Sequence, residues 1–274
     1  MMRRTTLLWL LAAGALVLAG CILFAGTMAA LGWDFSKLSV VQFETNTYPI
    51  GESFRDIAVT TDTADIAFAA SADGTCSVVV CEDAEHAKHT VTVEEQTLVI
   101  RLEQKSAWYD RIGLFLGTPK ITVYLPDAQH RALTVTGSTG NVELPQPLVF
   151  EHAEISLTTG NADLSASVSG TAAIRTSTGN IRAADTAVGA LDLSATTGAV
   201  RVTDVTCRDD LTVQVTTGDA ELCGVSCRNL VSGGSVGNLR LERVIAVEQL
   251  SIERSTGHVA FTGCAAGGIH VKTD

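Results

Sequence analysis

Polar and apolar residues alternate with a period of two in short stretches on both sides of a recurring glycine. Counting from that glycine, the second and fourth residues after it are apolar, and the third is polar in all copies but one. The fifth and seventh residues before it are apolar with a single exception. Such alternation indicates a strand with one buried face. Each copy therefore predicts two short strands joined by a turn at the glycine.

The glycine lies in a phrase of the form Ser/Thr-Thr-Gly-Asn that recurs along the second half of the chain. Its copies are centred on Gly140, Gly160, Gly179, Gly198, Gly218, Gly237 and Gly257, and successive glycines are 19 or 20 residues apart. A fixed period near twenty is typical of a solenoid, whose turns stack because one turn alone does not bury its apolar face. We expect the glycine to supply a positive φ and the preceding hydroxyls to hydrogen-bond the turn backbone.

The fold class that follows is all-β. We predict a single-stranded β-solenoid of about 19–20 residues per turn, in which each strand pairs with its equivalent in the next turn. A leucine-rich repeat also has a length near twenty, but it requires a Leu-x-x-Leu-x-Leu-x-x-Asn run. That run is absent from this sequence. We therefore prefer the solenoid.

The N-terminus carries a long apolar segment. Arg3 and Arg4 precede an uncharged run from residue 5 to residue 33, and its middle, Leu7 to Leu31, is long enough to span a bilayer. The positive-inside rule places the two arginines in the cytoplasm and the rest of the chain outside. We therefore expect a single-pass membrane protein with a cytoplasmic N-terminus, anchored in lipid through this helix.

An alternative anchor lies inside the same segment. Leu18-Ala19-Gly20-Cys21 is similar to a bacterial lipobox, in which the cysteine is lipidated after cleavage. The residues from Ile22 to Leu31 remain apolar, however, whereas a released lipoprotein usually begins with a polar tether. A retained helix is the preferred interpretation, and a lipoprotein anchored at Cys21 is the alternative.

These patterns divide the chain into four parts. We expect a membrane anchor at 1–33, a juxtamembrane linker at 34–50, an irregular β-sheet region capping the solenoid at 51–130 and the solenoid repeats at 131–274. Ile269 and Val271 already occupy the inward positions of a further turn, whose glycine would fall at about residue 276. We therefore expect an open last turn, or a natural chain that extends beyond Asp274.

Several motifs together resemble a known family. They are the apolar N-terminal helix followed by Trp33-Asp34-Phe35-Ser36-Lys37-Leu38, then Phe54-Arg55-Asp56-Ile57, Lys120-Ile121-Thr122-Val123-Tyr124-Leu125-Pro126 and the Ser/Thr-Thr-Gly-Asn ladder. This combination resembles the bacterial membrane-anchored β-strand-repeat proteins labelled "putative adhesin", a domain of unknown function. The resemblance implies an extracytoplasmic β-solenoid on a membrane anchor. It also implies a link to cell-envelope stress systems and offers no shared catalytic motif.

Composition narrows the choice of partner. The formal net charge is −11 and aromatic residues make up 5% of the chain. An acidic body argues against nucleic acid as a partner. Few aromatic side chains are present to stack on sugars, which favours protein partners slightly over polymers. No P-loop, dinucleotide fingerprint or nucleophile elbow is present.

Candidate reactive residues form no motif. Cys207 and Cys227 both lie nine residues after their glycines and should stack in adjacent turns, at a spacing that a disulfide tolerates; whether they are bridged stays open. Most of the seven cysteines are interpreted as small core residues. The six histidines are interpreted as surface residues. They are His86, His89, His130, His152, His258 and His270.

One outward column carries charge. It consists of Glu143, Asp163, Arg182, Arg201, Glu221 and Arg240. Some β-helical polysaccharide lyases use such a face, but they need clustered acids for calcium or a basic residue placed to take a proton. The order of signs here favours a solvated face with ion pairs across turns.

We therefore expect no catalytic, cofactor-binding or metal-binding residues and no enzyme activity. The expected function is a cell-envelope interaction or scaffold module, with an unknown envelope protein or polymer as partner. An adhesin that binds envelope glycan is the alternative, and a glycan-acting enzyme follows it.

Overall fold

The computed structural model describes residues 4–33, 43–83, 87–104, 118–126 and 128–273. The chain separates into two units, of which one contains the N-terminal helix and the other contains all the described strands. The helix α1 (Arg4–Ala30) holds a stretch, Trp9–Ala30, that is long and apolar enough to cross a membrane by length and composition. The β unit is described below by itself.

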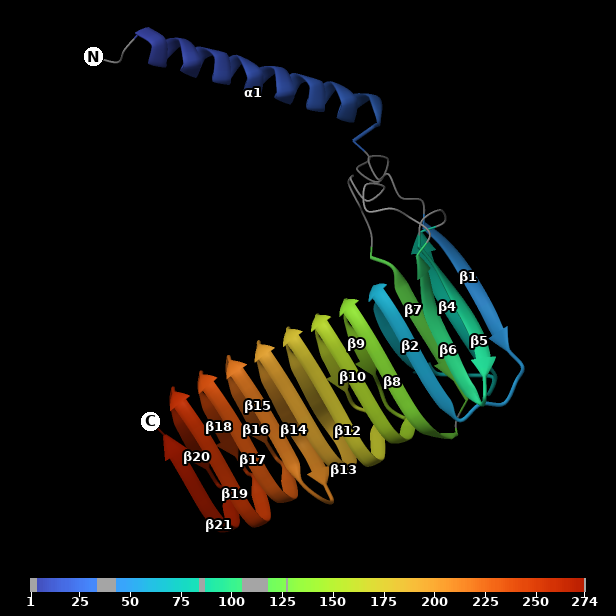
Figure 1. Ribbon diagram of the computed structural model, residues 1–274, viewed down its shortest axis with the longest axis vertical. Helices are drawn as coiled ribbons and strands as arrows, with labels where there is room; N and C mark the ends of the chain where they lie inside the picture. Colours follow the sequence, from blue (N-terminus) through green and yellow to red (C-terminus); the bar gives the residue numbers. More distant parts are fainter. Residues whose placement is uncertain (1–3, 34–42, 84–86, 105–117, 127, 274) are drawn as a thin grey trace. The chain divides into compact units, whose positions relative to one another are not determined.

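The predicted solenoid is confirmed by the pairing of strands (Figure 1). Long strands lead into the corner glycines: β8 (Gln129–Thr139), β10 (Val149–Thr159), β12 (Ser167–Thr178), β13 (Ile181–Thr197), β15 (Leu211–Thr217), β17 (Ser226–Val236) and β19 (Ile245–Thr256). Short strands follow the corners: β9 (Val142–Leu144), β11 (Ala162–Leu164), β14 (Val200–Cys207), β16 (Ala220–Cys223), β18 (Leu239–Glu242) and β20 (Val259–Thr262). After Gly179 the start of β13 plays this part, and β21 (Ala265–Thr273) ends the described chain.

Each strand pairs in parallel with its equivalent one turn away. Ile155, for example, lies opposite Val135 of the preceding turn and Ile174 of the following turn. The inward side chains of all turns merge into one continuous buried cluster. Its members are mostly Val, Ile, Leu and Ala, apolar residues that are often fully buried, and the β-branched Val and Ile are favoured in strands.

The corner glycines are required by space as well as by backbone angle. Their φ values lie between 135° and 149°. A Cβ added at any of them would lie 1.8–2.0 Å from a carbonyl oxygen of the turn below. Side chains other than hydrogen are therefore excluded at these corners. The prediction of a positive φ is confirmed, and the close approach of the backbones adds a second reason for glycine.

Asparagine rather than serine or threonine satisfies the corner backbone. Asn161 donates from its backbone N and from Nδ2 to Oδ1 of Asn141, and Asn180 repeats both bonds to Asn161. Asp65 begins this ladder by accepting the same two bonds from Asn141. Among the described residues, no hydroxyl of the Ser/Thr-Thr pairs hydrogen-bonds its turn backbone. The expected role of these hydroxyls was wrong in this respect.

A second column of corners lies six residues after the glycines. It consists of Asp185, Asp204, Gly224, Arg243 and Gly263, all with φ between 51° and 66°. This is the left-handed region that a non-glycine residue adopts at a cost. The column turns the chain from each short strand back toward the next long strand. Because its members are of three different residue types, this column cannot be recognised as a repeat in the sequence.

The region before the glycine repeats contains two further parallel turns. Strands β2 (Asp56–Thr63) and β3 (Asp65–Ala70) pair in parallel with β8 and β9, and Ala64 between them occupies the place of a corner glycine. Strands β6 (Thr97–Gln104) and β7 (Lys120–Leu125) pair in parallel with β2 and β3. The turn formed by β6 and β7 is thus the outer one, although it follows β2 and β3 in the chain.

Antiparallel strands cover this end. Strand β4 (Cys76–Asp83) pairs antiparallel with β7 and with β1 (Phe43–Ile50), and β5 (Ala87–Glu94) pairs antiparallel with β6. The expected linker at 34–50 therefore includes a strand in its last eight residues. Asp56 joins the turns by pairing with Arg131, with Nε 2.8 Å from Oδ1, and by accepting from the backbone N of Ala132.

Candidate functional site

The Ser/Thr-Thr pairs form an exposed hydroxyl ladder along the corner edge of the β unit. The name covers the two residues before each corner glycine: Ser138-Thr139, Thr158-Thr159, Ser177-Thr178, Thr196-Thr197, Thr216-Thr217, Ser235-Val236 and Ser255-Thr256. All fourteen side chains are exposed. Equivalent positions lie opposite one another in the strand register, so they repeat at about 4.8 Å. Thirteen of these side chains carry a hydroxyl, and Val236 is the exception. The ladder therefore offers an uncharged and nearly regular row of hydrogen-bonding groups.

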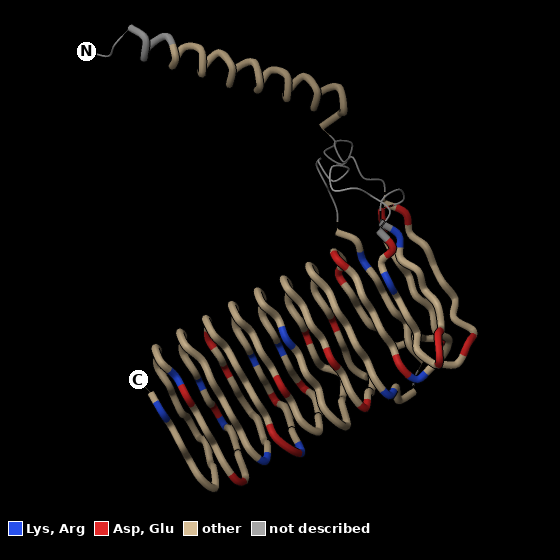
Figure 2. The backbone as a smooth tube through the Cα atoms, viewed as in Figure 1, with Lys and Arg blue, Asp and Glu red and all other residues tan. Residues whose placement is uncertain are grey.

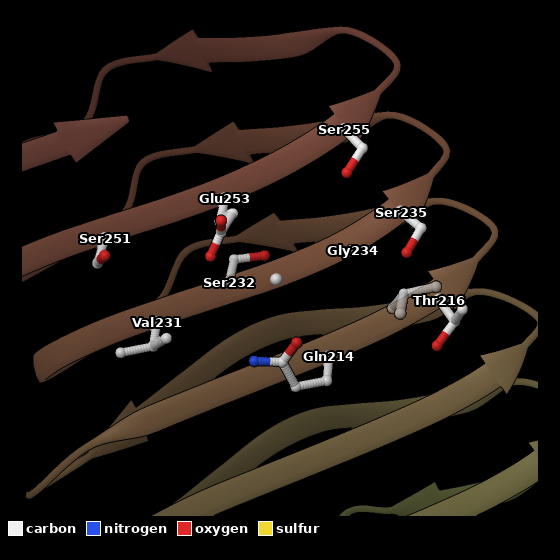
Figure 3. Close-up of a pocket in the computed structure, with 11 residues that line it drawn as sticks. Gln214, Thr216, Val231, Ser232, Gly234, Ser235, Ser251, Glu253 and Ser255 are labelled. Carbon is white, nitrogen blue, oxygen red and sulfur yellow. The ribbon is translucent and has the colours of Figure 1, made fainter. Parts of the chain in front are cut away.

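A notch interrupts the face beside this ladder. It lies over β15, β17 and β19, has a volume of about 310 Å³ and is open to solvent. In Figure 3, the hydroxyl-bearing residues Thr216, Ser235 and Ser255 form a row across the three neighbouring strands. Gln214 and Glu253 lie on either side of the middle strand. Their amide and carboxylate give the notch a polar lining of both donors and acceptors.

Two adjacent glycines create the notch. Gly233 stands at an outward position of β17 where the neighbouring turns carry Gln214 and Glu253. The next residue, Gly234, faces inward, and a Cβ there would lie 1.9 Å from Nη1 of Arg254. Neither glycine has a positive φ. The two glycines therefore leave room for other groups. Gly233 leaves room for the notch on the outer face, and Gly234 leaves room for the Arg254 side chain on the inner face.

Arg254 is the largest fully buried side chain of the described residues. It occupies an inward position of β19 and is 1% exposed. Its Nη2 donates to the Ser232 hydroxyl at 3.2 Å, while Nε and Nη1 have no hydrogen-bond partner. Burial lowers the pKa of the Arg254 guanidinium below its ordinary value. Burying a cation without a carboxylate partner lowers the stability of the folded state. Arg254 and Ser232 are the buried polar residues at this end of the described core.

The charged column predicted from the sequence is present as a stack. Glu143, Asp163 and Arg182 line a second hollow of about 280 Å³. Further along, Arg201 Nε lies 3.0 Å from Glu221 Oε2. Along this column two neighbouring pairs carry like charges and three carry opposite charges, and Figure 2 shows both signs interspersed over the stacked turns. Within the described residues, no group of three or more His, Cys, Asp or Glu side chains could hold a metal ion.

Two histidines are buried, which corrects the expectation of surface histidines. His89 is 4% exposed and its Nδ1 lies 2.9 Å from Glu82 Oε2, while its Nε2 lies 3.0 Å from the Thr61 hydroxyl. Glu82, which is 1% exposed, also accepts from Asn46 and from the His89 backbone. This order of groups resembles that of a hydrolase triad. Its members come from three strands, Glu82 from β4, His89 from β5 and Thr61 from β2, and all are buried, so the group fastens the antiparallel strands to β2.

His130 is buried between aromatic rings rather than in a polar network. Its ring stacks on Phe54 at a centroid distance of 5.8 Å and lies 5.8 Å from Phe150. Its Nε2 has no hydrogen-bond partner. Burial lowers the pKa of His130 below its ordinary value. The remaining described histidines, at 152, 258 and 270, are exposed as expected, and His86 lies outside the described residues.

The cysteines are free thiols. Cys76, Cys207 and Cys227 are buried, as expected for small core residues. Burial raises the pKa of Cys207 to about 12 and that of Cys227 to about 11. Both thiols are therefore protonated and weakly nucleophilic at neutral pH. Cys207 and Cys227 lie in adjacent turns and are not bridged in this structure.

Together, the stacked turns, the exposed hydroxyl ladder and the apolar N-terminal helix define a class: a β-solenoid with regular outer faces and one candidate membrane anchor. The chain belongs to the Toastrack DUF4097 family, whose model matches residues 54–259. The resemblance drawn from the sequence is confirmed. No curated protein matches the chain.

Solved bacterial structures share the fold. A "putative adhesin" from Parabacteroides merdae is 12% identical, with a TM-score of 0.54 over 86% of this chain and 96% of that chain. A "putative adhesin" from Parabacteroides distasonis is 10% identical, with a TM-score of 0.53 over 85% and 98%. A "putative lipid binding protein" from the same organism is 19% identical, with a TM-score of 0.52 over 84% and 95%. At these identities the likeness concerns the fold.

Proposed function

We propose that this protein is a non-enzymatic interaction module of the bacterial cell envelope, held at the membrane by α1 with the β unit on the outer side. The observation that carries the proposal is the hydroxyl ladder, an exposed, ordered face that runs along the repeat. Stacked repeats create such extended surfaces for partners. In the described repeats the ladder hydroxyls make no hydrogen bond to the corner backbone, which the asparagine side chains bond instead.

The orientation rests on the charge around the apolar segment. Arg3 and Arg4 precede it, and short basic flanks remain in the cytoplasm. Lipid contact through α1 is therefore part of the proposal, and lipidation at Cys21 remains the alternative anchor. We also propose that the chain is divided into an anchor, a linker, a capping region and repeats. Because residues 43–50 form β1, we assign that strand to the capping region rather than to the linker.

The class of partner separates two versions of this function. The low aromatic content favours a protein scaffold, in line with the envelope-stress link that the family resemblance implies. The polar notch on β17 favours a hydroxyl-rich polymer, which is the adhesin version named for the solved structures. An acyl chain would need an apolar groove, whereas Gln214, Glu253 and serine hydroxyls line the notch.

The absence of catalysis, cofactor and metal is likewise a proposal. The Thr61 hydroxyl lies 3.0 Å from His89 Nε2, but Thr61 is 6% exposed and lies inside the core. The acids of the charged column are dispersed along the stack rather than gathered around one bond. A glycan-cleaving activity of the full-length protein, assayed on isolated envelope, would overturn this part.

The test uses a membrane-impermeant, amine-reactive crosslinker on intact cells that make the protein naturally. Lys88, Lys120 and Lys272 are exposed on the β unit. We expect these lysines to react, and we expect one recurrent envelope component attached to them in mass analysis. Lysines that react only after the membrane is broken would contradict the proposed orientation. Accessible lysines without any recurrent component would contradict the interaction role.

A further inference from the structure

We propose that the notch and the neighbouring hydroxyl ladder bind a neutral glycan chain laid along the solenoid, with one sugar ring seated in the notch beside Gln214 and Glu253. This inference rests on the proposed function, because it names the chemical class of the partner. It is carried by the cavity, by the chemistry of its lining and by the continuity of the ladder.

The size of the notch suits a sugar. A volume of about 310 Å³ lies at the lower end of the range of small-molecule sites, roughly 300–1,000 Å³. The floor contains the backbone of Gly233 and Gly234. The Gln214 amide lies over Gly233, with its Oε1 2.1 Å from where a Cβ of that residue would stand, so a ring in the notch meets the strand and this amide together. Val231 and the Cα atoms of the two glycines supply the apolar part of the lining, against which the C–H face of a ring can pack.

The lining offers the hydrogen bonds that sugar hydroxyls use. Gln214 both donates and accepts, Glu253 accepts, and the hydroxyls of Thr216, Ser235 and Ser255 do either. Lys272 Nζ lies 2.7 Å from Glu253 Oε1, so the local charge is balanced. No basic side chain lines the notch, which disfavours phosphate and sulfate, and the acidic chain repels anionic polymers in general.

The ladder extends the notch along the axis of the solenoid. Thr216 and Ser235 belong both to the notch and to the ladder, which continues through the earlier turns toward Ser138. The ladder positions carry no charge in any of these turns. A polymer of repeated hydroxyl-bearing units can therefore meet equivalent hydroxyls turn after turn. Many weak contacts then add, as in other multivalent binding.

The experiment uses the full-length protein reconstituted in liposomes. The probes are linear hexasaccharides of glucose and of N-acetylglucosamine, with a hexasaccharide of galacturonic acid as the anionic comparison. The ladder variant combines T216V, S235A and S255A, which remove exposed hydroxyls and keep the outline of the side chains. The notch variant is G233N. Its added Cβ meets the flexible end of Gln214 at 2.1 Å and fills the seat without a positive φ.

Exposed hydroxyls elsewhere provide the matched control. Thr206 and Thr262 are exposed and lie outside the ladder, and T206V with T262V changes the same chemistry there. We expect the wild type and the control to bind at least one neutral probe and to leave the anionic probe unbound. We expect both test variants to bind that probe about tenfold or more weakly, because the ladder variant removes hydrogen bonds to the sugar and the added side chain of G233N occupies part of the notch.

The inference fails if the wild type binds neither neutral probe, or if both test variants bind as the wild type does. A far-UV circular dichroism spectrum confirms that each variant is folded. Failure here is distinguishable from failure of the proposed function. A recurrent protein crosslinked to outward-facing lysines would leave the interaction module standing and remove the glycan.

Discussion

Replacing a corner glycine by alanine should break the stack at that point. In the variant G198A, the new Cβ would lie 1.9 Å from the carbonyl oxygen of Gly179. Non-bonded carbon and oxygen atoms ordinarily approach to about 3.3 Å, so the two turns must separate by more than about 1 Å. The backbone angle adds strain, since φ is 144° at this residue.

The magnitude follows from these two terms. A residue other than glycine in this region of φ costs about 1–3 kcal/mol. Separating the turns weakens the hydrogen bonds that flank the corner, including the one from Gly198 N to Thr217 O at 3.0 Å, each worth about 0.5–1.5 kcal/mol. We expect a loss of about 3 kcal/mol or more, which is a large part of an ordinary folding free energy of about 5–15 kcal/mol.

The assay is urea unfolding of the full-length protein in detergent micelles, followed by far-UV circular dichroism. The matched control is G51A, because a Cβ there meets nothing within 4 Å and φ is ordinary. We expect G198A to unfold at a clearly lower urea concentration and G51A to unfold within about 0.5 kcal/mol of wild type. The reasoning is refuted if G198A matches G51A.

Three further changes test the interior. R254M should stabilise the protein by about 1–3 kcal/mol in urea unfolding at pH 7, because it replaces a buried cation that has no carboxylate partner by an apolar side chain; a loss instead would show that the hydrogen bond to Ser232 and the packing of the guanidinium outweigh the cost of its burial. The folded state holds the pKa of His130 below its ordinary value of 6.5, so the unfolded chain binds the proton more readily and stability falls as pH drops below about 6.5. H130F should remove that part of the pH dependence in thermal melts between about pH 7 and pH 5, and an unchanged slope would exclude His130 as its source. The hydrogen bond from Arg131 lowers the pKa of Asp56, so its contribution is present above the ordinary carboxyl pKa of 3.8 and is lost as pH falls through the folded value. D56N should therefore cost about 1 kcal/mol at pH 7, and the difference from wild type should vanish in acid; a difference that persists there would point to packing instead.

The sequence predicted the repeats because their rules are local. The glycine requirement, the alternation and the period can each be read within twenty residues, and the register of the strands follows from them. The inward position of Arg254, three residues before its glycine, was also readable from the alternation. A charged residue in a column of Gly, Leu, Thr, Ala and Val is the one local signal that this end of the core is unusual.

The missed features depend on pairing between distant residues. The outer turn formed by β6 and β7 lies beyond β2, although it comes later in the chain, and no local pattern encodes that order. Thr63-Ala64-Asp65 is a corner with alanine in place of glycine, and its likeness to Thr-Gly-Asn was the available signal. His89 is buried because Glu82 and Thr61 from other strands satisfy its ring, which spacing along the chain does not reveal.

The notch was partly readable. Gly233 and Gly234 are the fourth and third residues before their corner glycine. At these two positions every other turn carries at least one side chain larger than glycine. Its polar lining comes from three consecutive turns, however, and only the observed register brings Gln214 and Glu253 to either side of Gly233. The function of such a surface is therefore a question for structure and experiment together.

The central claim is that the ladder face meets an envelope partner outside the membrane. The most direct measurement places a photo-crosslinking amino acid at Ser235 in the full-length protein, in the cells that make it, with Thr206 as the comparison position. We predict light-dependent adducts with an extracytoplasmic component at Ser235 and few at Thr206. Equal labelling at both positions, or adducts with cytoplasmic proteins, would contradict it.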